Sequence, residues 1–401
     1  MRRGVLAVFL VAISSSCSML PTRAPGGGRC VDNADCGSGM TCDPGTLLCV
    51  CAGPNCPIDG GAGASGSGGA ASGGHAGGAG SGSGGASGSG GSMDAGPDVS
   101  TCAACGGNTP ICLQGSCVQC LASSDCNGDS TKPVCDTTTH TCAACTSDSQ
   151  CVAKLGSTGN PGICMSQIDG HCATDAEAIY VQNTTPTCKT TFVVGGGTAA
   201  NPYCSLDPIG LALSDTQSLV VIRGTVNNGG AWTYQRTSHP MTSFIGQQSA
   251  VVASSTTPGF NMTGGLAYLR GIRFTSAASQ GISASGGTLV VDTVVVDSCQ
   301  GGGVLLNGAA FSISNTTVTN NGPGQMGATA WGGILVDSLP SSGTTTLNLD
   351  TIQGNKGPGV LCSGQITGTG VFASGNSTTD IATATCGFSS CMPASSNCGA
   401  P

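Results

Sequence analysis

Four polar residues in the second half of the chain could form a binding or catalytic cluster. Arg270, Asp292, Asn315 and Asp350 occur in the segments LRGIRF, VDTVVVD, SNTTVTN and LDTIQGN. If these segments stack as neighbouring strands, the side chains form a ladder in which Asp292 and Asp350 lie about 10 Å apart, two strand spacings. Two carboxylates at that separation can flank a water molecule during sugar hydrolysis, or bind calcium or a sugar. The favoured alternative is structural: the side chains satisfy backbone groups at a bend, and Arg270 pairs with Asp292 on the surface.

Other catalytic groups are scarce in this half of the chain. After residue 240 there is no His, no Glu, one Lys (Lys356) and two Arg. The sequence therefore predicts no catalytic residue, no metal site and no cofactor, with calcium at the bend as the alternative.

Trp331 lies in the longest insertion of this region, GPGQMGATAWG at residues 322–332. A loop that projects from a repeat protein is a common place for binding, and an exposed Trp can stack on a sugar ring. The alternative, which we favour, is that Trp331 packs back over the stack and anchors the loop.

The elements that position these residues repeat along the chain. Apolar residues recur at spacings of 22, 22, 30, 26 and 21, at Phe260, Ile282, Val304, Ile334, Val360 and Ile381. A second apolar series follows at Phe274, Val296, Val318, Ile352 and Ala373, and a turn series at Ala277, Cys299, Asn321, Asn355 and Asn376. This period, with short apolar runs and no helical pattern, predicts a solenoid whose units bury their apolar residues against neighbours about 4.8 Å away. The three Asn residues are expected to form an internal turn ladder, and Cys299 is the candidate unpaired thiol.

The repeat resembles the right-handed parallel β-helix of the pectin-lyase-like superfamily. The resemblance covers about residues 173–390 and includes an upstream strand, a Gly-Thr loop and a short helix. Ser205 can cap this helix, while Leu206, Ile209 and Leu213 plug the open end of the stack. The predicted fold class is therefore all-β: a right-handed parallel β-helix over residues 173–401 with an N-terminal capping helix. Lyases of this superfamily bind calcium with carboxylates and use an Arg or Lys as the base. Its hydrolases use clustered Asp residues together with a His and an Arg-x-Lys motif. The sequence departs from both patterns.

Six cysteines are expected to tie down the two ends of this β-helix. Cys188 and Cys204 would close the loop between them. Four others would staple the C-terminal end, where a stack otherwise exposes an open strand edge: Cys362, Cys386, Cys391 and Cys398.

Cysteines also dominate two segments before the β-helix. Residues 30–56 hold six Cys and residues 102–172 hold twelve, including two successive sets with a C-x5-C opening: Cys120, Cys126, Cys135 and Cys142, then Cys145, Cys151, Cys164 and Cys172. Each unit is too small for a core of its own, so disulfides must substitute for buried apolar area. The pairing cannot be read from the sequence. Zinc is the alternative, because pairs such as Cys102 and Cys105 have metal-ligand spacing.

The first 17 residues form an export signal in plan. Two Arg residues precede a short apolar run, and SSSC follows it, as in a bacterial lipoprotein signal that ends at a lipidated Cys17; simple secretion is the alternative. Residues 60–92 are a Gly/Ser/Ala tract and predict a flexible linker. We therefore expect an extracytoplasmic protein at the outer membrane or cell surface, attached to a membrane through a lipid anchor only.

Composition and charge leave three hypotheses for function. A net charge of −8 with only 12 basic residues argues against nucleic-acid binding. The favoured hypothesis is a non-catalytic surface protein whose β-helix binds a polysaccharide or cell-envelope component. The alternatives are a polysaccharide lyase or glycoside hydrolase with an atypical site, and a structural spacer with no ligand.

Overall fold

The computed structural model describes most of the second half of the chain and parts of the first. The described residues are 40–43, 48–51, 105–126, 130–153, 161–229, 232–238, 241–326, 329–377, 379–381, 386 and 390–391. Residues 1–17 with Cys17, the predicted linker 60–92 and Cys398 lie outside them. The chain divides into two units, Met1–Ile58 and Asp59–Pro401. In the first unit, β1 (Met40–Asp43) and β2 (Leu48–Cys51) form an antiparallel pair.

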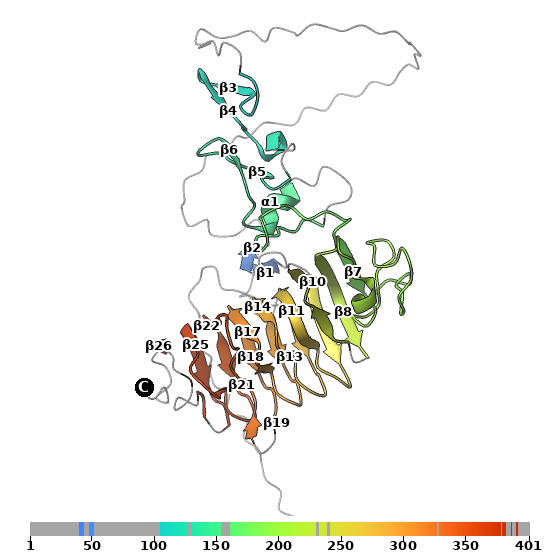
Figure 1. The fold of residues 1–401 in the computed structure, drawn as a ribbon, viewed down its shortest axis with the longest axis vertical. Coiled ribbons are helices and arrows are strands. Elements are labelled where there is room, and N and C mark those ends of the chain that lie inside the picture. Colours follow the sequence, from blue (N-terminus) through green and yellow to red (C-terminus); the bar gives the residue numbers. More distant parts are fainter. Residues whose placement is uncertain are drawn as a thin grey trace, which may run out of the picture. The chain divides into compact units, whose positions relative to one another are not determined.

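Parallel strands of the second unit stack into a solenoid of about 6 turns, which confirms the predicted all-β fold class (Figure 1). The first column of strands is β7 (Ala178–Gln182), β8 (Leu219–Asn228), β10 (Thr242–Ser254), β11 (Phe260–Arg270), β14 (Thr288–Asp292), β17 (Ala310–Ser314), β22 (Thr345–Asn348) and β25 (Thr367–Ser374). The second column continues β8 and β10 and adds β12 (Arg273–Thr275), β15 (Val295–Asp297), β18 (Thr317–Thr319) and β23 (Thr351–Gln353) before it ends on β25. The third column is β9 (Tyr234–Arg236), the start of β11, β13 (Ile282–Ser285), β16 (Val304–Asn307), β21 (Ile334–Ser338) and β24 (Val360–Cys362).

The predicted repeat positions are in register from turn to turn, as the sequence spacing implied. In the third column, each residue of the first series pairs with the next, from Phe260 to Ile381. In the second column, Phe274, Val296, Val318, Ile352 and Ala373 pair in the same way. Their side chains are buried in one core that runs through the stack. The strands form because alternate β-branched and aromatic side chains point inward, where only stacking can bury them.

The predicted asparagine ladder is confirmed at the turn after the second column. Asn355 accepts from the backbone N–H of Asn321 at 2.9 Å and donates to the carbonyl oxygen of Val318 at 3.1 Å. Asn321 and Asn376 make equivalent bonds to their own neighbouring turns. Cys299 continues this position one turn earlier; it is buried, it has no disulfide within the described chain, and burial raises the pKa of its thiol to about 11.

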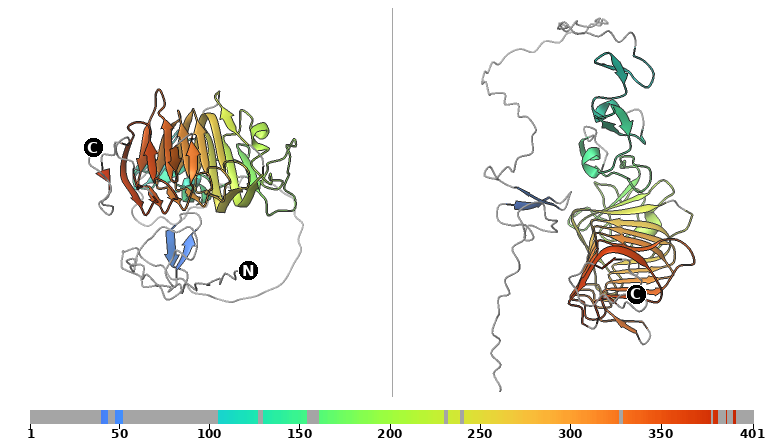
Figure 2. Two further views of the ribbon diagram at one scale, coloured as in Figure 1. Left: turned by 90° about the horizontal axis from the view of Figure 1, so that it is seen from below. Right: turned by 90° about the vertical axis from the view of Figure 1, so that its left-hand side faces the viewer.

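The two ends of the stack are closed differently. At the first end, a disulfide joins Cys188 to Cys204. The short helix α2 (Ile209–Ala212) follows in the chain and lies at the same end of the stack (Figure 2). Leu206 and Ile209 are buried in the core as predicted. Ser205 does not cap α2 itself, which begins after Pro208 with no side-chain cap in the described structure. Its hydroxyl accepts instead from the Asp207 backbone N–H at 3.4 Å, in the turn just before the helix, and donates to Asp207 Oδ2 at 3.1 Å. At the other end, Cys362 is bonded to Cys386, and the backbone of Cys391 lies in β26 (Ser390–Cys391), beside β25.

The cysteine-rich region repeats one disulfide pattern. Its elements are β3 (Ile111–Leu113), β4 (Ser116–Val118), the 3-10 helix η2 (Ser123–Cys126), β5 (Val134–Asp136), β6 (Thr141–Ala143) and α1 (Asp148–Ala153). In each of the two sets found in the sequence, the first Cys pairs with the third and the second with the fourth: Cys120–Cys135 and Cys126–Cys142, then Cys145–Cys164 and Cys151–Cys172. The identical pairing makes these sets two copies of one stapled unit.

The second of these units packs directly on the outside of the solenoid. Its residues Ile163 and Met165 join a buried apolar cluster with side chains that point outward from β7, β8, β10 and β11: Ala178, Tyr180, Leu219, Val221, Ile245 and Tyr268. Gln247 of β10 also donates to the carbonyl oxygen of Pro161 at 2.9 Å. The first turns are therefore apolar on both sides of the strand wall. Among the described residues, no helix has the length and apolar composition needed to cross a membrane.

Candidate functional site

Arg270 marks the edge of the surface that the cysteine-rich unit covers. It ends β11 and lies beside Asp292 of β14 in strand register, as predicted. Its guanidinium nevertheless binds Asp148 of α1, with Nη2 at 2.8 Å from Oδ1 and 2.9 Å from Oδ2. The expected surface pair of Arg270 with Asp292 is thus replaced by a pair with the docked unit. Sequence reasoning missed this partner because the two residues are 122 positions apart.

Asn315 contacts Asp292, but from a different place on its turn. Asp292 pairs in register with Ser314 and Ser314 pairs with Asn348, so Asn315 lies one position beyond the ladder, at the bend. Its φ of 53° is in the left-handed region, which Asn tolerates better than most residues. From there Nδ2 donates to Asp292 Oδ1 at 2.8 Å.

Asp350 lies on the opposite side of the strand wall from Asp292. It follows Asn348 by two positions, and its side chain is only 1% exposed. Equivalent positions on the other turns are Ile272, Val294, Thr316 and Val371, all buried. Asp350 Oδ1 accepts from the Thr316 backbone N–H at 2.9 Å, and Oδ2 has no hydrogen-bond partner among the described residues. Burial raises the pKa of this carboxyl to about 8, although the Thr316 bond opposes the shift.

The predicted two-carboxylate ladder is therefore wrong. Asp292 is half-buried on the outer face, whereas Asp350 points into the core, so the two carboxylates do not face a common substrate. The error is one of register: the residue aligned with Asp292, through Ser314, is Asn348, two positions before Asp350. Leu349, which lies between Asn348 and Asp350, has a φ of 55°, and this left-handed bend turns the chain so that Asp350 faces inward.

The outer face of the first column carries neutral polar side chains after the docked unit ends. Ser312, Thr346 and Thr367 pair in one row, and Ser314, Asn348 and Thr369 pair in the adjacent row. Two neighbouring pairs are hydrogen-bonded through their side chains: Thr346 Oγ1 donates to Ser312 Oγ at 3.2 Å, and Thr369 Oγ1 donates to Asn348 Oδ1 at 3.2 Å. Ser314 Oγ instead donates to Asp292 Oδ1 at 3.3 Å. We call these six residues the hydroxyl–amide face. It offers regularly spaced donors and acceptors and can bind another neutral polar molecule without any charged group.

Trp331 is a packing residue, as favoured from the sequence. The insertion forms an antiparallel hairpin of β19 (Gly324–Met326) and β20 (Thr329–Trp331), and Trp331 is 0% exposed. It packs on Leu305 and Leu335, which point outward from β16 and β21. Glycine is needed at Gly302, where φ is +105° and a Cβ would overlap the indole ring. Outward leucines on successive turns, in VLLN and ILVD, were the sequence signal for such a cover.

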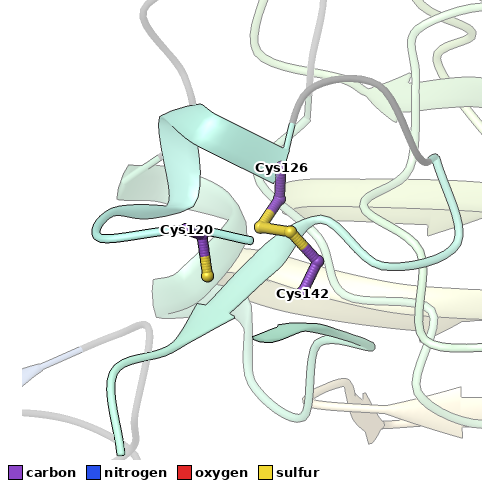
Figure 3. Close-up of side chains that lie close together, drawn as sticks. All are labelled: Cys120, Cys126 and Cys142. Atoms are coloured by element: carbon purple, nitrogen blue, oxygen red, sulfur yellow. A yellow bond between two sulfur atoms is a disulfide. The ribbon is translucent and has the colours of Figure 1, made fainter. Parts of the chain in front are cut away.

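The cysteine sulfurs that come closest together are held in disulfides. The sulfur atoms of Cys120, Cys126 and Cys142 lie within 4.8 Å of one another, a spacing that could suit a metal ion. Figure 3 shows the bond between Cys126 and Cys142, while Cys120 is bonded to Cys135. Thiolates are the metal-binding form of cysteine, so these bonded sulfurs do not form the zinc site considered above.

A polar cluster that sequence reasoning missed joins the second cysteine unit to the first strand. The imidazole of His171 bonds Asp169 through Nδ1 and Glu177 Oε1 through Nε2, the latter at 2.9 Å. The hydrogen bond to Glu177 is the main cause that raises the His171 pKa to about 9. Burial disfavours ionised Glu177, but bonds from His171 and Thr174 outweigh it and lower the Glu177 pKa to about 2. These contacts are ion pairs that hold two segments of the chain together, and they do not form an open site.

In comparisons with protein-family models, with curated proteins and with solved structures, nothing matches this chain.

Proposed function

We propose that the chain is an exported, lipid-anchored surface protein whose solenoid binds a polysaccharide or another cell-envelope component without turning it over. On this proposal, Cys17 carries the lipid, the solenoid is a right-handed β-helix like those of the pectin-lyase-like superfamily, and the protein resides at the outer membrane or cell surface. Disulfide-stapled units support export, because disulfides persist in oxidising compartments.

The separation of Asp292 from Asp350 carries the non-catalytic part of the proposal. Hydrolysis of a glycosidic bond by two carboxylates needs both groups on the same substrate, and Asp350 is buried in the core. The guanidinium of Arg270 is already paired with the Asp148 carboxylate. Beside Asp292, the outer wall carries the hydroxyl–amide face, whose donors and acceptors are suited to a neutral hydroxyl-rich polymer lying across the strands.

The test measures both binding and turnover. The mature chain is passed over plant, algal and bacterial polysaccharides, with and without calcium, while released reducing or unsaturated ends are assayed. We expect retention without release. Thr346→Ala combined with Asn348→Ala should weaken retention by about tenfold, whereas the matched pair Thr317→Ala and Thr351→Ala on the second column should not.

Two outcomes contradict the proposal. Release of ends would make the protein an enzyme and would direct attention back to Asp292. Absence of both retention and release would leave a structural spacer as the better account. The lipid anchor is checked separately by labelling the protein with a radioactive acyl chain. We expect Cys17→Ser to lose the label, and unchanged labelling would refute the anchor at Cys17.

A further inference from the structure

The loop between Cys188 and Cys204 is held rigidly at the first end of the solenoid. The disulfide closes it, and its segment near Tyr203 hydrogen-bonds along the free edge of β7: Tyr180 N–H donates to Gly197 O at 2.7 Å, and Gln182 N–H donates to Tyr203 O at 2.8 Å. The loop therefore covers the strand edge that would otherwise be open. Its base is fixed both covalently and by backbone bonds, so its tip is presented in a defined position.

That tip exposes consecutive apolar side chains. Phe192, Val193 and Val194 are 44%, 38% and 95% exposed, and Leu211 of the adjoining helix α2 is 76% exposed. These are four of the nine large apolar residues that are exposed in the described part of the chain, and they fall within 20 residues of sequence. The loop and α2 lie at the same end of the stack (Figure 2). Such concentrated exposure is typical of an interaction site.

Size and charge indicate which kind of partner this end fits. A stable protein interface buries roughly 800 Å² on each partner, more than four partly covered apolar side chains can supply. Insertion at the surface of a bilayer needs only a few apolar side chains at the headgroup boundary. From Cys188 to Cys204 the loop has no Asp or Glu and one basic residue, Lys189; the exposed Asp207 is the one carboxylate between the loop and Leu211. The loop itself therefore carries no carboxylate that would oppose approach to anionic headgroups.

We propose that the Phe192–Val194 tip of this disulfide-closed loop inserts into the surface of a lipid bilayer. The contact would orient the first end of the solenoid toward the membrane. It is independent of polysaccharide binding and of the lipid on Cys17, and it can be tested when both are absent.

The experiment uses the chain without residues 1–17, which removes the apolar signal run and Cys17 but none of the described residues. Binding to vesicles of phosphatidylglycerol and phosphatidylethanolamine is measured by co-sedimentation. Phe192→Ser with Val194→Ser should weaken the partition by about tenfold, the order expected from losing one buried Phe-sized side chain. The matched control, Leu339→Ser with Leu349→Ser, removes two leucines exposed elsewhere and should bind like the parent.

A second readout locates the inserted residue. Phe192→Trp places a fluorophore at the tip, while Trp232 and Trp331 are buried and provide a constant background. Vesicles that contain lipids brominated on the acyl chain should quench the emission added by Phe192→Trp when they bind the protein.

Three results would overturn the proposal. The first is no sedimentation of the parent chain with these vesicles. The second is equal loss of binding in the loop pair and the leucine control. The third is a change in the oligomeric state of the protein alone on Phe192→Ser and Val194→Ser, because the tip would then contact a second copy. Mass spectrometry of the Cys188–Cys204 disulfide confirms that each variant retains the loop.

Discussion

At the scale of single residues, the buried carboxyl of Asp350 has the clearest consequence for stability. Its pKa is about 8 in the folded chain and 3.8 for an ordinary Asp side chain. Between these values the folded protein retains a proton that the unfolded chain has released. The Asp350 contribution to the free energy of unfolding therefore falls as the pH rises, by about 1.4 kcal/mol for each pH unit in this window, and it is present in full only below pH 3.8.

We predict that Asp350→Asn removes this pH dependence and stabilises the protein at neutral pH. The amide is neutral at every pH, and its oxygen can still accept from the Thr316 backbone N–H. Chemical denaturation between pH 5 and pH 9 measures the slope. Asp292→Asn, a change on the outer face, is the control and should leave the slope as it is. An unchanged slope in Asp350→Asn would mean that the carboxyl is hydrated in solution.

At the scale of the structural element, the asparagine ladder connects the later turns through buried polar groups. Each amide bonds the backbone of one neighbouring turn and the side chain or backbone of another, as Asn355 does with Asn321, Val318 and Asn376. Since buried polar groups are costly when unpaired, the ladder makes each turn dependent on the next. Asp380 ends the ladder by accepting from Asn376 at 2.9 Å.

We predict that Asn355→Ala destabilises the solenoid by about 2–4 kcal/mol, because it leaves the Asn321 N–H and the Val318 carbonyl unpaired in the core. Asn348→Ala on the same turn is the control. Its side chain bonds Thr369 on the outer face, and its loss should cost less than about 1 kcal/mol. Equal effects in urea denaturation would show that the ladder is no more important than a surface hydrogen bond.

At the scale of the whole second unit, the docked cysteine-rich repeat and the solenoid share one apolar contact. Ile163 and Met165 bury the outward side chains of the first turns. Two ion pairs, Arg270–Asp148 and His171–Glu177, accompany this contact. The repeat therefore shields the outer apolar face of these strands from solvent. Strands that are apolar on both faces are typical of parallel sheets that are covered on both sides.

We predict that Ile163→Asp undocks the repeat without breaking its disulfides, because it places an unpaired charge in the apolar contact. Tyr180 and Tyr268, both buried there, should then react with tetranitromethane, while Tyr234 in the solenoid core stays protected. Ile168→Asp, at an exposed position of the same repeat, is the control. Nitration of Tyr234 as well would indicate unfolding of the solenoid instead of undocking.

The sequence by itself determined the repeat, its register at the positions from Phe260 to Ile381 and from Phe274 to Ala373, the asparagine ladder and the existence of two similar cysteine units. It could do so because stacked strands bury every turn in the same way, so the requirement recurs along the chain at a readable period. Only the tertiary structure decided the candidate site. Whether Asp350 faces inward depends on a one-residue bend, Trp331 is buried by leucines from other turns, and Arg270 bonds Asp148 across 122 positions. These facts depend on contacts between distant segments, which no local pattern encodes.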